Sequence, residues 1–177
     1  MGSSGCVSFF TRKYIPRNVI PANLEQSVTD LPQVFMDLVR YETRLYNALG
    51  ERLRTEHGLT MGQYEFLRII DSQDDCRVND LAEEAAITVG ATSKGVDRLE
   101  AAGWVIRRPN PSNRRSSLLE LTPEGGKLLA AATPTFQGGL RSWLAAPLTT
   151  HALEELASTI ALLRTTLQDA STGTLGG

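Results

Sequence analysis

The fold is decided by residues 79–121, which read NDLAEEAAITVGATSKGVDRLEAAGWVIRRPNPSNRRSSLLEL. The first half has the composition of two short helices, and the second of them ends at Gly103, a residue type that often closes helices in the left-handed conformation. A β-rich run at 104–106, a turn-forming stretch at 109–113 and a return run at 116–121 follow. This order predicts a mainly α fold with a small β-hairpin wing, a winged helix-turn-helix.

Polar residues mark the expected helix starts in this stretch. Asn79 can accept a hydrogen bond from the free amides of the first helix, while Asp80 complements the positive end of that helix. Thr88 is expected to cap the second helix. The spacing directs one face of the second helix to the core, with Val89, Val96 and Leu99, and another face away from it, with Thr92, Ser93, Lys94 and Arg98.

Small residues are unusual in this second helix. Gly90 and Gly95 each cost about 1 kcal/mol of helix stability relative to alanine, and Ala91 adds to the bare surface. Such a cost indicates that the helix approaches something closely. Tight packing inside the protein and contact with a duplex backbone are two interpretations that the sequence leaves open.

The hairpin is basic although the chain as a whole is not. The formal net charge is −2, but residues 104–119 hold no acid and four arginines, Arg107, Arg108, Arg114 and Arg115. A solvated hairpin would explain these charges by itself. Their position directly after a helix-turn-helix favours a nucleic-acid partner, because the local charge matters more than the net charge.

Two further helices are predicted before the winged stretch. An apolar stripe with helical spacing begins at Val34 and continues until the chain reaches Gly58. Thr60 and Gln63 then have the spacing of a capping box, which predicts the start of the next helix.

The last third of the chain is also expected to be helical. The string Thr122-Pro123-Glu124 predicts a helix start, and Pro134, Gly138 and Gly139 imply a kink or a frayed middle. Thr149 is the expected cap of a final helix. Its apolar residues recur with heptad-like spacing at Leu153, Leu156, Ile160, Leu163 and Leu167. This seam would pack either on the first long helix or on a second subunit, and the length of the flanking helices favours the second subunit.

Taken together, these motifs resemble the multiple antibiotic resistance regulator (MarR) family. The resemblance covers about residues 34–167 and is carried by LA at 81–82, TVGATSK at 88–94, DRLEAAGWV at 97–105, RPNP at 108–111, NRR at 113–115 and LTPEG at 121–125. It implies a homodimeric winged-helix transcriptional repressor that binds a pseudo-palindromic operator in double-stranded DNA. Such a repressor is released by a small molecule or by oxidation.

The resemblance also implies roles for residues of the second helix. That helix, beginning at Thr88, would enter the major groove, with Thr92, Ser93 and Lys94 nearest the bases and Arg98 near phosphate. Phosphate contacts would supply salt-dependent affinity, and base contacts would supply specificity.

In the wing, Arg114 and Arg115 would lie in or along the minor groove, where the negative potential attracts guanidinium groups. Arg108 and Asn113 belong to the same expected surface. Asp97 would orient the hairpin by pairing with a wing arginine, expected to be Arg115. The family commonly has an aspartate where this chain has Asn113, so an ion pair through that acid would be absent.

Similar proteins hold effectors in a crevice between the dimerisation helices and the winged module. The residues of this chain that could line such a crevice are Tyr41, Arg44, His57, Tyr64 and Phe66. Core packing is the alternative for each aromatic ring, and an exposed loop position is the alternative for His57. A phenolic or aromatic effector is expected.

Other functional classes have little support. Neither the cysteines, Cys6 and Cys76, nor the histidines, His57 and His151, have zinc-site spacing, so no metal or other cofactor is expected, and a reducing cytoplasm is the expected compartment. No catalytic residue grouping appears, which argues against an enzyme. No apolar run is long enough for a membrane span. A thiol switch at Cys6 or Cys76, and a winged helix used only for protein contacts, remain alternatives.

The predicted organisation has three parts. Residues 1–32 form an extension that is either flexible or a short extra helix. Residues 33–170 form the MarR-like domain, with the winged helix-turn-helix at 60–121 and dimerisation helices at 33–58 and 122–170. Residues 171–177 form a flexible tail.

Overall fold

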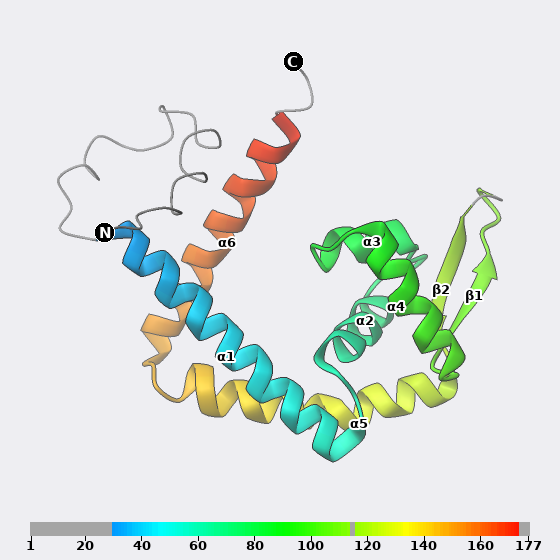
Figure 1. Ribbon diagram of the computed structural model, residues 1–177, viewed down its shortest axis with the longest axis horizontal. Coiled ribbons are helices and arrows are strands. Elements are labelled where there is room, and N and C mark those ends of the chain that lie inside the picture. Colours follow the sequence, from blue (N-terminus) through cyan, green and yellow to red (C-terminus); the bar gives the residue numbers. More distant parts are fainter. Residues whose placement is uncertain (1–29, 114–115, 174–177) are drawn as a thin grey trace, which may run out of the picture. The chain divides into compact units, whose positions relative to one another are not determined.

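Residues 30–113 and 116–173 are described by a computed structural model, with side chains as far as residue 168. Within this part of the chain, the elements in order are α1 (Leu31–His57), α2 (Met61–Ser72), α3 (Val78–Glu84), α4 (Val89–Ala101), β1 (Val105–Pro109), β2 (Ser117–Leu121), α5 (Pro123–Leu140), a π-helical turn (Arg141–Ala145) and α6 (Thr150–Gly173) (Figure 1). This order confirms the predicted fold class, a mainly helical winged helix-turn-helix with long flanking helices.

The chain divides into two units after Arg40, so the boundary falls within α1. In the first unit, the helix begins after Asp30, whose carboxylate accepts a hydrogen bond from the backbone N–H of Gln33 at 3.3 Å. A second side-chain bond, from Gln33 to Asp37, lowers the pKa of the Asp37 carboxyl. Residues 31–32 are therefore helical, contrary to the predicted boundary at 32, and the rest of the predicted extension, 1–29, lies outside the described residues.

In the second unit, the helices around the hairpin share one apolar core. Its fully buried side chains include Leu53, Leu59, Leu67, Leu81, Val96, Leu99 and Val105. The capping box predicted for α2 is confirmed, because the Gln63 backbone donates to Thr60 and the Gln63 side chain accepts from the Thr60 backbone. Gly95 lets α4 approach α2, since a Cβ there would lie 2.4 Å from Cε2 of Phe66. Tight internal packing therefore explains this glycine.

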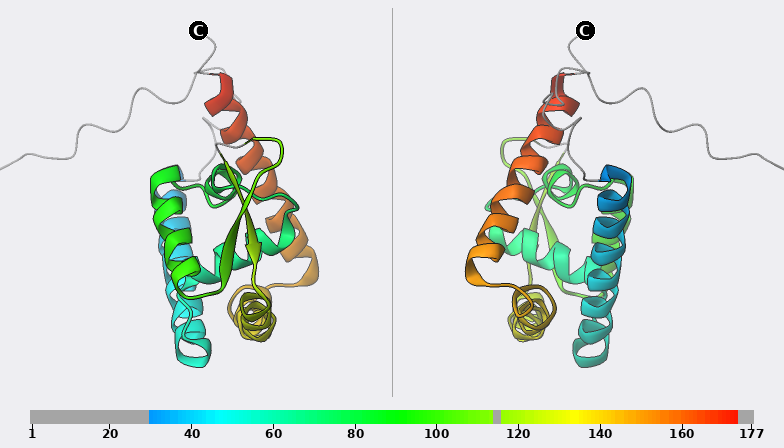
Figure 2. Two further views of the ribbon diagram at one scale, coloured as in Figure 1. Left: turned by 90° about the vertical axis from the view of Figure 1, so that its right-hand side faces the viewer. Right: turned by 90° about the vertical axis from the view of Figure 1, so that its left-hand side faces the viewer.

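The hairpin is an antiparallel pair whose register joins Val105 to Leu121 at its base and Pro109 to Ser117 toward its tip. The linker between α2 and α3 extends the sheet, because the Leu119 backbone N–H donates to the carbonyl of Cys76 at 2.7 Å. Figure 2 shows α4 running beside this hairpin. The helix and the wing therefore form one continuous surface.

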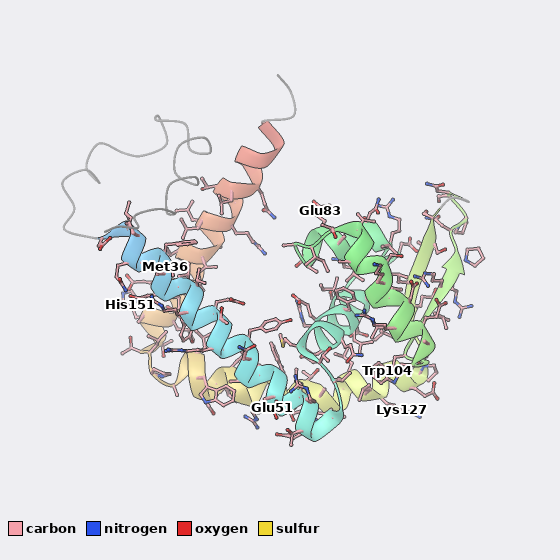
Figure 3. All side chains as sticks on the ribbon, in the orientation of Figure 1. Met36, Glu51, Glu83, Trp104, Lys127 and His151 are labelled. Carbon is pink, nitrogen blue, oxygen red and sulfur yellow. The ribbon has the colours of Figure 1, made fainter. Side chains whose placement is uncertain are left out.

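The base of the wing is fixed to the start of α5. Gly103 closes the α4 segment with φ of 76°, as predicted for a left-handed cap. The Trp104 carbonyl accepts from the Thr122 backbone at 3.0 Å, and Thr122 also caps α5 through Gly125 at 3.0 Å. In Figure 3, Trp104 is seen at this junction. A Cβ on Gly125 would lie 2.0 Å from the Trp104 carbonyl oxygen, so only glycine fits there.

Two local predictions in the helix-turn-helix are wrong. Asn79 does not cap α3, because the helix begins earlier, with Arg77 as its N-cap residue and Asp80 accepting from the Arg77 backbone at 3.0 Å. Hydrogen bonds from Arg77 also lower the pKa of the Asp80 carboxyl. Val89 does not pack in the core, since it is the first residue of α4 and is 50% exposed.

The last helices also differ from the expected pattern. Helix α5 continues past Pro134, and the irregular segment is the π-helical turn that follows Gly139. Gly139 lies against α1, where an added Cβ would come within 2.5 Å of Cδ2 of Leu49.

Thr149 caps α6 as predicted, because its side chain accepts a hydrogen bond from the Ala152 backbone N–H at 3.2 Å. The helix reaches residue 173, so the predicted tail at 171–177 begins too early, and 174–177 lie outside the described residues. No helix in the described ranges has both the length and the apolar character needed to cross a membrane.

Candidate nucleic-acid interface

Helix α4 has one face in the core and one free face. Thr88 caps the helix by accepting a hydrogen bond from the Ala91 backbone at 3.3 Å. With about 100° between successive residues, Gly90 and Lys94 point away from the buried side chains of Val96 and Leu99, and both are exposed. The free face of α4 therefore begins at its first turn and continues along the helix.

Thr92 does not belong to this free face. Its side chain is 0% exposed, and its hydroxyl donates to the Thr88 carbonyl at 3.0 Å. The prediction that Thr92 lies nearest the bases is wrong, because Thr92 falls one turn before Val96 on the core side and its hydroxyl is satisfied by its own helix. Ser93 is half-buried, while Lys94 and Arg98 are exposed.

Arg107 ties the wing to α4. This arginine lies on β1, and its guanidinium donates to Asp97 at 2.6 Å and also to Glu100. Its side chain is 25% exposed, so two carboxylates share one partly buried cation. Arg115, the wing arginine expected to pair with Asp97, lies outside the described residues, as does Arg114. Among the described residues, the arginine that pairs with Asp97 is Arg107, in the middle of β1. Apart from its charge, nothing in the sequence marked Arg107 as this partner.

Other cations near the wing are also neutralised. Arg108 donates to Glu120 at 2.6 Å across the hairpin, and Arg77 pairs with Asp80 at 2.7 Å. Lys94 and Arg98, in contrast, form no ion pair within 4 Å with any residue that the structure describes. The positive charges of Lys94 and Arg98 are therefore available to an external anion.

The described part of the wing turn is built by asparagines. The side-chain oxygen of Asn110 accepts from the Ser112 backbone at 2.9 Å, and its amide donates to the Ser116 hydroxyl at 3.0 Å. The Asn113 carbonyl accepts from the Ser116 backbone at 3.0 Å. These bonds form the turn on either side of residues 114–115, which lie outside the described residues.

The residues predicted to line one effector crevice lie in different places. Tyr41 and Arg44 line a hollow of about 290 Å³ together with Leu45, Ala48 and Trp143, and the Tyr41 hydroxyl donates to the Trp143 carbonyl at 3.1 Å. Tyr64 is 2% exposed and packs against Phe136 with ring centroids 4.6 Å apart, at the edge of a separate groove between α2 and α5. Phe66 is a core residue at 7% exposure.

His57 is neither in the hollow nor in an exposed loop. It is the last residue of α1, and its Nε2 lies 2.8 Å from the hydroxyl of Thr135 on α5. The Thr135 hydroxyl donates to Glu56 at 2.6 Å and so lowers the pKa of that carboxyl. Because the hydroxyl proton is directed to Glu56, the Thr135 oxygen accepts a hydrogen bond from the Nε2–H of His57. His57 therefore joins α1 to α5.

Cys76 has the properties of a structural thiol. Its side chain is 1% exposed, and burial, with a smaller contribution from Asp80, raises its pKa to about 11. A thiol that reacts with oxidants needs exposure and a low pKa. The structure thus argues against a redox switch at Cys76, while Cys6 lies outside the described residues. In the described ranges, no three His, Cys, Asp or Glu side chains are placed to hold a metal ion.

The fold and the free face of α4 define a helix-turn-helix protein of the winged class. Residues 59–117 match the sequence model of the MarR family, which confirms the predicted resemblance over this winged segment.

Curated relatives agree with this match. The multiple antibiotic resistance protein MarR of Escherichia coli K12 is 29% identical over 107 residues, which cover 58% of this chain and 74% of that protein. The transcriptional regulator HosA of Escherichia coli O111:H- is 36% identical over 76 residues, covering 43% of this chain and 56% of HosA. The match with the transcriptional regulator BilQ of Clostridioides difficile spans about half of that relative, 53%. HosA and BilQ are both named as transcriptional regulators.

Solved structures show the same architecture. Sco3205, a MarR family transcriptional regulator from Streptomyces coelicolor solved in complex with DNA, superposes with a TM-score of 0.72 at 27% identity, covering 77% of this chain and 90% of that chain. A mutant MarR from E. coli complexed with operator DNA gives a TM-score of 0.64 at 25% identity, covering 78% and 99% of the two chains.

Proposed function

We propose that this protein is a dimeric, sequence-specific regulator of transcription that binds double-stranded DNA and represses until a small aromatic molecule releases it. The observation that carries the proposal is the free face of α4, where Lys94 and Arg98 are exposed and unneutralised among the described residues, beside a wing held in place by Arg107. A recognition helix in the major groove needs such a face, with cations for phosphates and short side chains for base edges.

Two features favour DNA over a protein partner for this surface. The exposed charges on α4 that lack an internal partner are positive, and phosphate is the anion that a basic helix and wing meet in a duplex. Sco3205, the structural neighbour described above, was solved with DNA. A winged helix used only for protein contacts would not need this arrangement.

Dimerisation is supported by the exposed apolar side chains of α6. Ile160, Leu162 and Leu163 are 50%, 68% and 54% exposed, which is costly unless another helix covers them. A second copy would provide such a helix by two-fold symmetry. It would also present two α4 helices to half-sites about 34 Å apart, one turn of DNA, which suits a pseudo-palindromic operator.

DNA binding is tested by the salt dependence of affinity. A duplex is first selected from a random library with the full chain, and fluorescence anisotropy then follows its binding between 50 and 300 mM salt. Because each phosphate contact contributes about 0.9 to the slope of log affinity against log salt, Lys94→Ala or Arg98→Ala should flatten the slope by about two units per dimer.

Lys127→Ala is the matched control for Lys94→Ala, since it removes an exposed lysine of α5 (Figure 3) and changes the net charge equally. Its slope should stay within about half a unit of the unsubstituted protein. Equal slopes for Lys94→Ala and Lys127→Ala, or no binding to any duplex at low salt, would contradict the proposal and leave protein contacts as the use of the fold.

The hollow beside Tyr41 is the proposed effector site. Tyr41 and Trp143 offer aromatic faces, and Arg44 offers a guanidinium at the same rim, a combination that suits an aromatic carboxylate. The hollow lies between α1 and the π-helical turn after α5. A ligand there would therefore favour one arrangement of the dimerisation helices over another.

Calorimetry with benzoate and hydroxybenzoates tests this site. Arg44→Ala should abolish binding, whereas Arg54→Ala, at an exposed arginine paired with Glu51, should not. The acid must also weaken operator binding by the factor by which the operator weakens acid binding. Tight acid binding that leaves operator affinity unchanged would refute release by this ligand.

A further inference from the structure

Gly90 stands in the first turn of α4 without a steric reason inside the protein. A Cβ added there would meet no heavy atom within 4 Å, whereas the same atom at Gly95 would collide with Phe66. Gly90 is also not among the glycines with positive φ, which are Gly58 and Gly103 in the described ranges. The fold would therefore accept alanine at residue 90, and the helix would gain from it.

The position of Gly90 indicates where the constraint lies. Gly90 is exposed, four residues before Lys94 on the same side of the helix, and opposite the buried Val96 and Leu99. Residues at the start of a recognition helix are the ones that approach base edges in the major groove. The bare backbone thus lies where the proposed DNA surface begins.

We infer that Gly90 is the point of closest approach between α4 and the duplex, where the missing side chain lets the helix backbone enter the major groove to its full depth. This inference rests on the proposed DNA-binding function and adds to it a residue that sets the docking distance. A methyl group at residue 90 would hold the first turn away from the duplex by about the length of a C–C bond, roughly 1.5 Å.

Such a displacement matters because hydrogen bonds weaken quickly with distance. A contact of about 2.9 Å between Ser93 and a base edge would lengthen beyond about 3.5 Å, where a direct hydrogen bond no longer exists. Binding to non-specific duplex, which depends on longer-range attraction to phosphates, would change little. Gly90 is therefore a positioning residue whose effect falls on specificity.

Gly90→Ala is tested beside Gly126→Ala, a helical glycine of α5 whose added Cβ also meets nothing within 4 Å. Both substitutions should leave the melting temperature unchanged or raise it by about 1–3 °C. Gly90→Ala alone should weaken binding to the selected duplex by roughly 10-fold or more, with non-specific binding within about 3-fold of the unsubstituted protein. Gly90→Val should weaken specific binding further.

Three results would overturn the inference. Unchanged specific affinity for Gly90→Ala would show that the duplex does not approach residue 90. A melting temperature lowered by Gly90→Ala but not by Gly126→Ala would show that the constraint is internal. If the unsubstituted protein binds no duplex, the proposed function fails and this inference fails with it, whereas normal DNA binding by Gly90→Ala refutes the inference alone.

Discussion

Replacing Asp97 by asparagine separates two roles of an acidic residue on α4. Asp97 is an exposed carboxylate beside the proposed DNA surface, so its removal should strengthen DNA binding if only charge repulsion matters. The Asp97 carboxylate also accepts a hydrogen bond from Arg107 at 2.6 Å and helps to hold the wing against α4. If this positioning matters more, Asp97→Asn should weaken DNA binding. The two roles predict changes of opposite sign.

The expected size follows from the geometry of the pair. Arg107 keeps Glu100 as a second partner after the substitution, so the wing is loosened rather than released. A partly exposed ion pair contributes about 0.5–1 kcal/mol. A dimer contains two such pairs, and losing both would cost about 1–2 kcal/mol of DNA affinity, or roughly 5- to 30-fold in Kd. The free energy of unfolding should fall by no more than about 1 kcal/mol per protomer.

Fluorescence anisotropy with the selected duplex measures the change, and urea unfolding checks that the protein remains folded. Glu83→Gln is the control, because it removes an exposed acid of α3 (Figure 3) that forms no ion pair within 4 Å with the described residues. Its Kd should be unchanged or lower. A Kd for Asp97→Asn that is equal to or below that of the unsubstituted protein would refute the positioning role of the Asp97–Arg107 pair.

Three further substitutions test other parts of the structure. Gly125→Ala should destabilise the fold by about 3 kcal/mol, because its Cβ would lie 2.0 Å from the Trp104 carbonyl oxygen, whereas Gly126→Ala should not lower the melting temperature. Leu163→Glu should weaken dimerisation at least roughly 100-fold in sedimentation equilibrium, because it places two charges in the proposed interface, and an unchanged dimer would place the interface elsewhere. Burial raises the pKa of Cys76 from 9.0 to about 11, so the folded state holds this proton more tightly and stability should fall as pH rises through that range. In Cys76→Ala this part of the loss of stability at high pH should disappear. The same pH dependence of stability with and without the thiol would contradict the raised pKa of Cys76.

The elements that local chemistry specifies were predictable from the sequence. Thr60 with Gln63, Thr88, Gly103 and Thr122 each act within a few residues, and all of them occupy the predicted caps. Their effect depends on backbone hydrogen bonds between near neighbours in the chain, so it does not require knowledge of the tertiary packing.

Side-chain directions were harder to predict, because they depend on which neighbours cover a helix. Thr92 has the polar side chain expected of a base-contacting residue but lies in the core. Val89 has the apolar side chain expected of a core residue but is exposed at the start of α4. The pairing of Arg107 with Asp97 and Glu100 joins residues ten and seven positions apart across a helix and a strand. Nothing in local spacing distinguishes Arg107 from the other wing arginines.

The effector candidates lie apart in the fold for a similar reason. Tyr41, Tyr64 and Phe66 have the same aromatic character in sequence, but one borders a hollow, one stacks on Phe136 and one fills the space above Gly95. Trp143 completes the hollow from a segment distant in sequence. Only the fold brings Trp143 next to Tyr41.

The central claim is that α4 binds in the major groove, and dimethyl sulfate footprinting tests it directly. This reagent methylates guanine N7 in the major groove and adenine N3 in the minor groove, so it reports which groove is covered. We expect guanine N7 to be protected in two patches about one helical turn apart, and this protection to be lost with Lys94→Ala but retained with Lys127→Ala. Protection confined to adenine N3, or a guanine pattern unaffected by Lys94→Ala, would contradict the account.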